Sequence, residues 1–494
     1  MTFGRLLVAV VACCAVLPTA AAAAPGPDAR LQLVTTSNQV DAVRYQPNQP
    51  AFAEFPAFIV PASSSPFELR VGRAELGKPI TVTQVVYGAG RPTDRSLPGG
   101  LVTDFRHGGL ERFFRLSVAD QLGKVRIRRD SSFCPAYRTR ASRGSAEQPI
   151  YPDVCGTWFG GNPFILAQVW GIESGWAAPA LGFDQSVLDL PDGTYLGQLL
   201  VLDRYRQLFG IPGADAVASF TIHVRTLPPG GMPGQPARPP DLRQHSVASG
   251  LPAPPAPERP TGPPTAKPDP ATVPDLTPVP AWGVQAVLDQ QHHDQLTFSA
   301  TVWNAGPARL SVDGFRRNGT NLMDAYQNFY RDGKPVGYQL VGTFQYDPRR
   351  GHEHWHFSDF ATYNLLDAHG SRVMRSGKEA FCIAPTDAEN LMMPGADWRP
   401  SYLGFGQCGT QASISLNETM PAGWGDTYIQ SLPGQAFDIT SLPNGIYQIE
   451  VLANPLGRLY ETNTANNRSL RQVRLGGTPG HRTAVALPYN GITG

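Results

Sequence analysis

The turns Leu190-Pro-Asp-Gly-Thr-Tyr195 and Leu442-Pro-Asn-Gly-Ile-Tyr447 decide the fold, because each leads directly into an apolar run. Proline presets the backbone of a turn and glycine adopts conformations closed to other residues, so both hexapeptides predict a tight turn before a strand. The tyrosine resembles the tyrosine corner of β-sandwich domains, in which the phenol hydrogen-bonds back to the turn. Two such corners predict two β-sandwich-like domains, and two unrelated turns are the alternative.

Short strands are predicted throughout the chain. Phe220, Ile222 and Val224 alternate with polar residues, which is the period of a strand with one buried face. In the second half, strands are predicted at 296–302, within a histidine-containing stretch, at 446–452 and at 470–475. No long helical periodicity interrupts this pattern, so the predicted fold class is all-β.

A proline-rich segment divides the chain. About every third residue of 227–273 is proline and few are apolar, which predicts an extended, semi-rigid spacer. The N-terminal β-sandwich-like domain is therefore expected at 31–226 and the second domain at 274–475. The tail, 476–494, carries no clear pattern and is left unassigned.

The N-terminus has the composition of a secretory signal peptide. Residues 1–24 combine Arg5, the apolar run 6–17 and small residues, and cleavage is expected near Ala22–Ala24. A weak lipoprotein alternative rests on the residues before Cys13. No later run approaches the ~20 apolar residues of a membrane span, so we expect a secreted protein.

Charge and cysteine content narrow the class of protein further. The formal net charge of +1 gives no global field that would attract nucleic acid or an acidic membrane surface. Loss of the signal peptide leaves four cysteines in an oxidising setting, where disulfides persist. Their positions predict the pairs Cys134 with Cys155 and Cys382 with Cys408, one bridge in each domain.

A dense set of nitrogen ligands lies in 351–367, GHEHWHFSDFATYNLLD. His352, His354 and His356 occupy alternate residues, so in a strand they face one side. Imidazoles suit zinc, copper, iron or nickel. Three such positions of a straight strand span about 13 Å, too far for ligands ~2 Å from one ion, so the strand must bend or only two histidines bind. An adventitious metal-binding surface and a hydrolytic zinc site are the alternatives.

Further sequence blocks accompany the histidines in a fixed order. These blocks are His352-Glu-His-Trp-His356, Ser358-Asp-Phe360, Tyr363-Asn-Leu-Leu-Asp367, Gly377-Lys378-Glu-Ala-Phe-Cys382, Asp426-Thr-Tyr428 and Phe437-Asp-Ile-Thr440. Together they resemble the catalytic domain of lysyl oxidases, a family of secreted copper amine oxidases with a self-made quinone. The resemblance covers roughly 274–475 and none of the N-terminal half.

The resemblance implies a role for five residues. His352, His354 and His356 would bind copper. Copper and oxygen would oxidise the ring of Tyr428, and the amine of Lys378 would add to it, giving the cofactor lysine tyrosylquinone. Lys378 is one of only five lysines in the chain. A solvated surface lysine and a packing tyrosine are the alternative interpretations of this pair.

The implied activity is the oxidative deamination of primary amines, with peptidyl lysine as one candidate substrate. Molecular oxygen is the co-substrate, and aldehyde, ammonia and hydrogen peroxide are the products. A nearby carboxylate or histidine would act as the general base, and the candidates are Asp359, Asp426 and His369. The alternatives are a non-catalytic secreted copper-binding or cell-wall-associated module, and a zinc or iron enzyme. The N-terminal domain is expected to be a binding or scaffolding module.

A calcium site is also implied by the resemblance. Glu461-Thr-Asn463-Thr-Ala-Asn466-Asn467 matches the family pattern E-x-D-x-x-N-N, and Asp275 with Leu276 matches its partner segment. Carboxylate, amide and backbone oxygens are the ligands that calcium prefers. Asn463 stands where the pattern has aspartate, so the affinity should be lower. A polar turn is the alternative.

The chain also departs from the family. Cys382 and Cys408 are the only cysteines of this domain, whereas the animal enzymes carry several disulfides around the same core. The segment between Lys378 and Tyr428 is longer than in the family. We expect this inserted loop to shape the substrate entrance.

Overall fold

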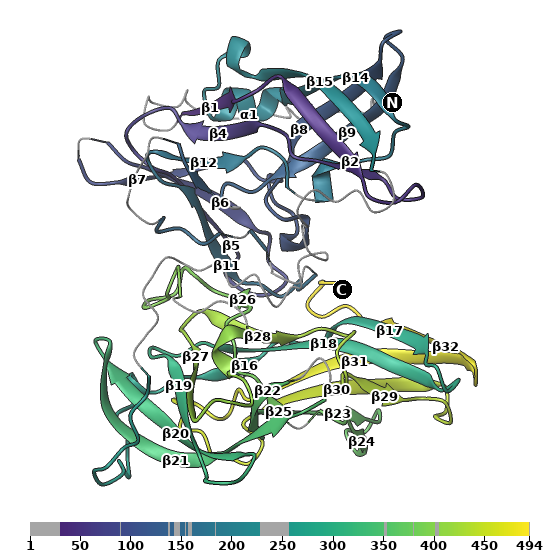
Figure 1. Ribbon diagram of the computed structural model, residues 1–494. Coiled ribbons are helices and arrows are strands. Elements are labelled where there is room, and N and C mark those ends of the chain that lie inside the picture. The colour runs from purple at the N-terminus through teal and green to yellow at the C-terminus, as the bar shows by residue number, and fades with distance from the viewer. Residues whose placement is uncertain are drawn as a thin grey trace, which may run out of the picture.

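The computed structural model describes residues 30–88, 90–136, 139–142, 149–153, 155–156, 161–182, 184–227, 256–349, 353–378, 380–400 and 405–493. Within these ranges the protein is almost entirely β, as predicted, with one short α-helix. The expected signal peptide, residues 228–255 of the spacer and His352 lie outside the described residues. The N-terminal and C-terminal strands form two separate bodies that contact each other (Figure 1).

The N-terminal domain consists of three sheets, with strand orders β1-β4-β12-β10, β11-β5-β6-β7 and β13-β3-β2-β15-β14-β8-β9. Its strands are β1 Leu31–Thr35, β2 Gln39–Arg44, β3 Ala51–Ala53, β4 Ala57–Pro61, β5 Phe67–Gly72, β6 Thr81–Val86, β7 Thr93–Ser96, β8 Leu110–Asp120, β9 Val125–Phe133, β10 Arg140–Ala141, β11 Ala167–Ile172, β12 Trp176–Pro179, β13 Val187–Leu188, β14 Gly193–Val201 and β15 Val217–Thr226. Its helices are η2 Phe105–His107, η3 Asp184–Ser186, α1 Asp203–Leu208 and η4 Gly213–Asp215.

The C-terminal domain also has three sheets, ordered β16-β18-β28-β26, β25-β22-β21-β20-β19-β27 and β24-β23-β30-β31-β32, and β17 and β29 also pair with β18. Its strands are β16 Leu276–Pro278, β17 Trp282–Leu288, β18 Asp294–Asn304, β19 Leu310–Arg316, β20 Leu322–Arg331, β21 Lys334–Asp347, β22 His354–Ser358, β23 Ala361–Leu366, β24 Arg372–Arg375, β25 Ala380–Phe381, β26 Asp387–Ala388, β27 Ser415–Met420, β28 Trp424–Tyr428, β29 Ala436–Asp438, β30 Gly445–Ala453, β31 Arg468–Thr478 and β32 His481–Ala486. Its short helices are η6 Pro270–Thr272 and η7 Phe405–Cys408.

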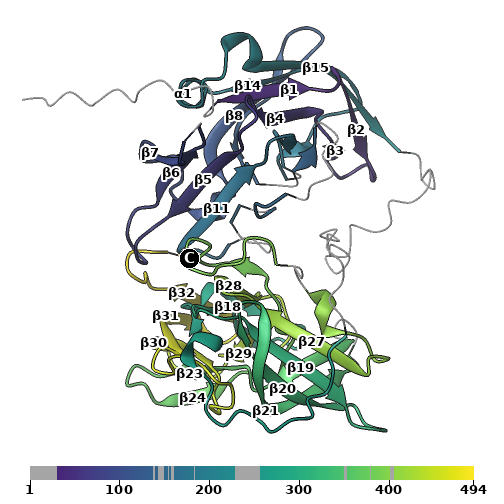
Figure 2. The same cartoon turned by 90° about the vertical axis from the view of Figure 1, so that its left-hand side faces the viewer.

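The predicted strands are confirmed, and their alternation explains the cores. Phe220, Ile222 and Val224 of β15 are buried while their neighbours face outward. Each domain has its own hydrophobic cluster, and most of the second cluster comes from residues between Leu276 and Leu475. Figure 2 shows the two bodies one above the other after a quarter turn, with β11 at the boundary between them.

Both tyrosine corners are confirmed. The Tyr195 hydroxyl donates to the Pro191 carbonyl over 3.0 Å, and the Tyr447 hydroxyl donates to the Pro443 carbonyl over 2.9 Å. Each phenol thereby ties the start of its strand, β14 or β30, to the preceding turn. The two equivalent corners support the two-sandwich arrangement.

The two ends of the second domain extend beyond the expected bounds. The spacer was expected to reach residue 273, yet Arg259 pairs with Asp324 at 3.2 Å and the Thr265 amide donates to the Tyr338 carbonyl. This end of the spacer is therefore packed on the domain rather than extended. In the tail, which was left unassigned, β31 continues to Thr478 and β32 adds a further strand to the same sheet.

Replacing Tyr447 by Phe should lower the free energy of unfolding of the second domain by about 1 kcal/mol, because one net hydrogen bond is lost while the ring stays buried. Urea denaturation followed by tryptophan fluorescence measures this change. Tyr45→Phe is the matched control, since Tyr45 is 44% exposed and should change stability by less than ~0.5 kcal/mol. Equal stability of Y447F and Y45F would contradict the corner's role.

Candidate active site

Strand β28 places Asp426 and Tyr428 on one face of a buried sheet. All five of its residues are buried. It pairs antiparallel with β18, with Tyr428 opposite Ala300 and Asp426 opposite Val302. Residues two apart on a strand face the same side, so the Asp426 carboxylate lies beside the Tyr428 ring.

Lys378 lies between β24 and β25 and reaches the same point. Its side chain is 6% exposed. The Nζ atom lies 4.1 Å from the centroid of the Tyr428 ring and 5.2 Å from that of Phe381. Phe381 meets Tyr428 edge to face, with the ring centroids 5.1 Å apart. The structure therefore brings together the lysine and tyrosine singled out in the sequence.

Gly434 permits this approach and was missed by the sequence reasoning. Its φ is +85°, and a Cβ there would lie 3.1 Å from the Lys378 amide nitrogen and 3.2 Å from its Cα. Glycine is the residue that combines this backbone conformation with so close a contact. The sequence signal is the turn dipeptide Pro-Gly434, which follows Leu432. The neighbouring residues do not indicate that this turn packs against the Lys378 backbone.

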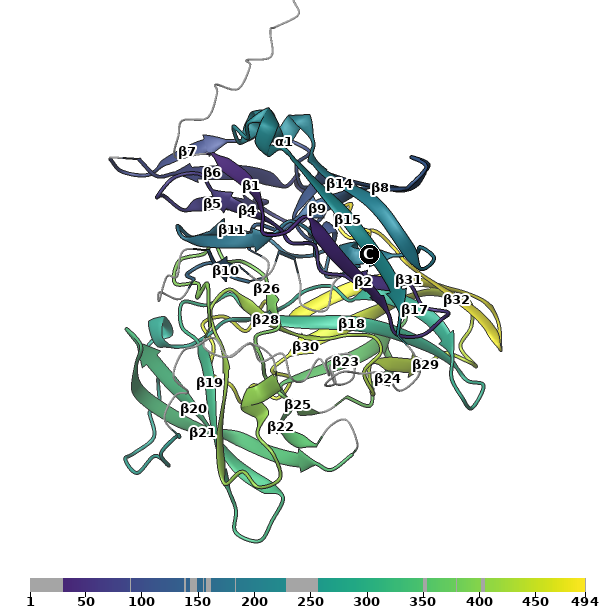
Figure 3. The same cartoon turned by 45° about the horizontal axis from the view of Figure 1, so that its top comes forward.

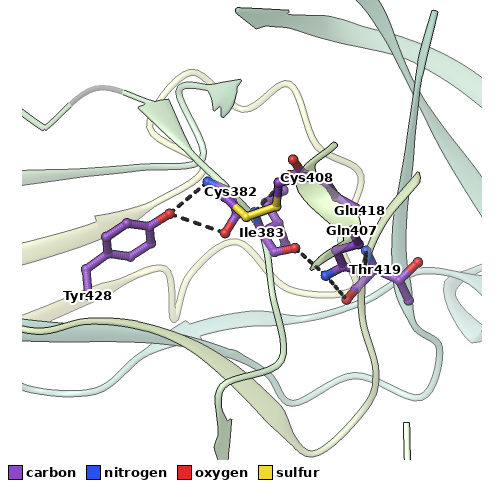
Figure 4. Close-up of a disulfide and its surroundings, with 7 residues drawn as sticks. All are labelled: Cys382, Ile383, Gln407, Cys408, Glu418, Thr419 and Tyr428. Atoms are coloured by element: carbon purple, nitrogen blue, oxygen red, sulfur yellow. Dashed lines mark hydrogen bonds between the residues drawn. A yellow bond between two sulfur atoms is a disulfide. The ribbon is translucent and has the colours of Figure 1, made fainter. Parts of the chain in front are cut away.

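The phenol oxygen of Tyr428 is held by the backbone of Cys382 (Figure 4). The Cys382 amide donates to it over 2.7 Å, and the phenol donates to the Cys382 carbonyl over 3.2 Å. The predicted disulfide Cys382–Cys408 is confirmed, as is Cys134–Cys155 in the other domain. The next amide, that of Ile383, donates to the buried Glu418 carboxylate over 2.8 Å. These contacts fix the orientation of the ring.

Burial shifts the pKa values of all three central groups. The pKa of Lys378 falls to about 8, chiefly through desolvation, although the nearby Asp426 carboxylate opposes this fall. Desolvation likewise raises the pKa of Asp426 well above its usual value, opposed by the Lys378 ammonium. Burial and the Asp426 charge raise the pKa of the Tyr428 phenol. The lowered pKa of Lys378 increases the fraction of neutral amine, which is the form that a nucleophilic lysine requires.

The structure separates the three candidate general bases. Both carboxyl oxygens of Asp426 are buried, and the Ala384 backbone amide is the hydrogen-bond donor that acts on the pKa of this group. Asp359, which has φ of 63°, pairs with Arg458 at 3.3 Å in the turn between β22 and β23. His369 lies in an exposed turn. Asp426 is therefore the carboxylate best placed to accept a proton beside Tyr428.

Two of the three histidines lie on β22 in the adjoining sheet. The ring centroids of His354 and His356 are 4.4 Å apart, and His356 is buried. Strand β22 pairs with β21, where Asp347 lies opposite His354. The Arg349 guanidinium holds the pKa of Asp347 down to about 2. His356 is buried and His354 half-buried, and two imidazoles this close are ligand types that suit a transition-metal ion such as copper.

Among the described residues, one group of three ligand-type side chains lies close enough together to share a metal ion, and it consists of Cys382, Cys408 and Glu418. Its two sulfur atoms are joined to each other in the disulfide. Metal ligation by cysteine requires a thiolate. This cluster therefore fits no metal ion, and the histidines are the better donor set.

The expected calcium residues come together at the start of β16. The Leu276 amide donates to Glu461, which also accepts from the Asn467 side chain over 2.7 Å. The Asn466 side-chain amide donates to the Asp275 carboxylate, with Nδ2 3.1 Å from Oδ1. The buried side-chain oxygens of Asn466 and Asn467 have no hydrogen-bond partner in the described structure.

These unsatisfied oxygens and two carboxylates whose pKa values are raised by burial, Asp275 and Glu461, fit a hard cation such as calcium. Asn463, which stands where the family pattern has aspartate, differs from these residues in its exposure. It is exposed, and its side-chain oxygen accepts from the Ala465 amide over 3.0 Å.

Residues in this part of the chain are similar to a known protein family. Residues 340–484 match the family described as "Lysyl oxidase". The chain is 30% identical over 160 residues to "Lysyl oxidase homolog 2" of Gallus gallus and 30% identical over 155 residues to "Lysyl oxidase homolog 4" of Mus musculus. These alignments cover 30% and 31% of this chain, and 18% of each relative. The chain thus spans less than a fifth of these relatives' length.

The lowered pKa of Lys378 can be measured directly. In protein produced without copper, NMR of ¹³C-labelled lysine should show one resonance that titrates near 8. The shifted resonance should be absent in Lys378→Met. Because the Asp426 charge raises the pKa of Lys378, Asp426→Asn should lower that pKa further. A Lys378 resonance that titrates near ~10.4, the usual value for lysine, would contradict the buried, desolvated position.

Calcium should stabilise the protein through the Asp275–Glu461 site. A ligand that binds only the folded state at 100 times its Kd stabilises that state by about 2.7 kcal/mol, so calcium should raise the Tm in differential scanning fluorimetry. Glu461→Gln should abolish the rise, whereas Asn463→Asp, which restores the family's carboxylate, should lower the calcium concentration required. An equal rise in the wild type and Glu461→Gln would contradict this site.

Proposed function

From the lysyl oxidase match of residues 340–484 as premise, we propose that the protein is a secreted amine oxidase that uses copper and lysine tyrosylquinone. Its reaction is the oxidative deamination of a primary amine to an aldehyde, with release of ammonia and hydrogen peroxide. The observation that carries the proposal is the 4.1 Å separation between Lys378 Nζ and the Tyr428 ring. No bond can form between these two side chains unless they approach in this way.

Each central residue has a defined task in this proposal. Lys378, with its pKa near 8, presents a neutral amine to the ring carbons of Tyr428. The Cys382 backbone holds the phenol oxygen and so keeps the ring from turning. Asp426 lies beside the ring and accepts the proton that leaves the substrate's α-carbon.

His354 and His356, joined by His352 from outside the described residues, would hold the copper ion. Copper and the quinone supply the electron-accepting chemistry, with oxygen as the final oxidant. Buried aromatic residues around Tyr428, Phe381 among them, exclude water from the pair. The substrate class is a primary amine, and peptidyl lysine is the specific form we would test first.

Two features support export of the protein. The N-terminal segment has the composition of a secretory signal peptide. Both domains carry a disulfide, and disulfides persist in oxidising compartments. Among the described residues, no helix has the length and apolar character needed to cross a membrane.

The proposal predicts a covalent quinone. Purified with copper, unfolded and stained for redox-cycling quinone, the wild type should stain, whereas Lys378→Ala and Tyr428→Phe should not. Lys334→Ala is the matched control, because Lys334 is an exposed lysine at the start of β21 and should leave the stain intact.

The outcomes separate the competing functions. Equal staining of the wild type and Lys378→Ala would contradict the enzyme proposal. Copper bound to the wild type without amine-dependent peroxide release would favour a non-catalytic copper-binding module. Metal analysis that finds zinc or iron in place of copper would favour the remaining alternative.

A further inference from the structure

Backbone hydrogen bonds join the N-terminal domain to the C-terminal domain. The amides of Leu166 and Ala167 both donate to the Glu389 carbonyl, over 2.9 and 3.1 Å, and the Leu391 amide donates to the Ala167 carbonyl over 2.8 Å. Ala167 and Asn390 form a parallel bridge. Figure 3 shows β11 of one domain next to β26 of the other, with β28 beyond it. The segment after β26 thus continues the pairing of an N-terminal sheet.

A buried polar pair accompanies these backbone bonds. The Asn162 side-chain amide donates to the Glu389 carboxylate over 2.5 Å, and these side chains are 0% and 1% exposed. Arg73, which donates to the Pro163 and Ile165 carbonyls, favours the charged form of Glu389, but burial dominates and raises its pKa. A buried carboxyl that lost this amide would bear an uncompensated desolvation cost.

The other side of the same segment supports the strand of Tyr428. The amides of Glu389 and Asn390 both donate to the Gly423 carbonyl, over 2.9 and 3.0 Å. Strand β26 pairs with β28, with Asp387 opposite Gly425. A Cβ at Gly425 would lie 3.2 Å from the Glu389 Cγ. Residues 387–391 therefore lie between β11 of the N-terminal domain and β28.

Aromatic packing extends this contact. Tyr151 of the N-terminal domain stacks on Trp398, with ring centroids 5.8 Å apart and an interplanar angle of 20°. The Trp398 indole donates to the Leu391 carbonyl over 3.0 Å, and the Trp424 indole donates to the Asp397 carbonyl over 2.6 Å. This part of the inserted loop thus lies against the N-terminal domain.

We propose that the N-terminal domain positions the cofactor-forming strand, and that Asn162 is its positioning residue. Asn162 fixes residues 387–391 through its hydrogen bond to Glu389. These residues in turn hold β28 at the register that presents Tyr428 to Lys378. The inference rests on the proposed function for its chemical consequence, but the effect on β28 is a separate physical quantity. It gives the N-terminal domain a task within the chain.

The test compares full-length Asn162→Ala, Glu389→Ala and Glu389→Gln with the wild type. Hydrogen exchange of the β28 amides in metal-free protein measures how firmly the strand is held. Mass spectrometry of the Lys378–Tyr428 cross-linked peptide, after copper and oxygen are added, measures cofactor formation. Loss of one buried hydrogen bond should speed exchange in β28 by about tenfold and reduce the cross-linked fraction.

Glu389→Gln should keep both β28 exchange and the cross-linked fraction at the wild-type level, because the glutamine amide oxygen still accepts from Asn162. Asn38→Ala, an exposed asparagine of the same domain, is the matched control and should behave as wild type. Unchanged β28 exchange in Asn162→Ala would overturn the inference, and so would global unfolding of that variant, since a local effect is predicted. Faster exchange in a protein whose wild type forms no cross-link would support the positioning and refute the proposed function.

Discussion

Strand β28 is hydrogen-bonded on both edges, and the site depends on this pairing. Strand β18 fixes Tyr428 opposite Ala300, and β26 fixes Gly425 opposite Asp387. A strand paired on both sides cannot slip by one residue without turning all its side chains to the opposite face. The register of one five-residue strand therefore determines that a carboxylate and a phenol meet a buried amine, and the surrounding sheets serve to maintain it.

The features predicted from sequence are those with a local physical signal. The two Pro-Asp/Asn-Gly turns, the alternation in β15 and the order of the cysteines each depend on residues close together in the chain, and the structure has all of them. The pairing of Lys378 with Tyr428 is different. Periodicity could not link two residues so far apart, and only the ordered blocks shared with a known family pointed to it.

The features that were missed all arise from long-range packing. Gly434 has the sequence context of an ordinary turn glycine. Its contact with Lys378 arises because the turn between β28 and β29, distant in the sequence, packs against the lysine backbone. Glu389 and Asn162 read as loop residues in separate domains, yet both are fully buried against each other. An insertion carries no sequence signal for the surface that it covers, so the contact of this loop with the N-terminal domain was missed as well.

The two disulfides join cysteines that are neighbours in cysteine order, separated by 21 and 26 residues, and each lies within one domain. In the export that we propose, both cysteines of the first pair would cross the membrane before either later cysteine does. An oxidase that joins thiols as they emerge would thus make both native bridges in sequence, without isomerisation of a wrong pair. The Cys382–Cys408 bridge can then form before Tyr428 packs against the Cys382 backbone. Oxidative folding would thus place the backbone groups that bind the Tyr428 hydroxyl before the tyrosine reaches them.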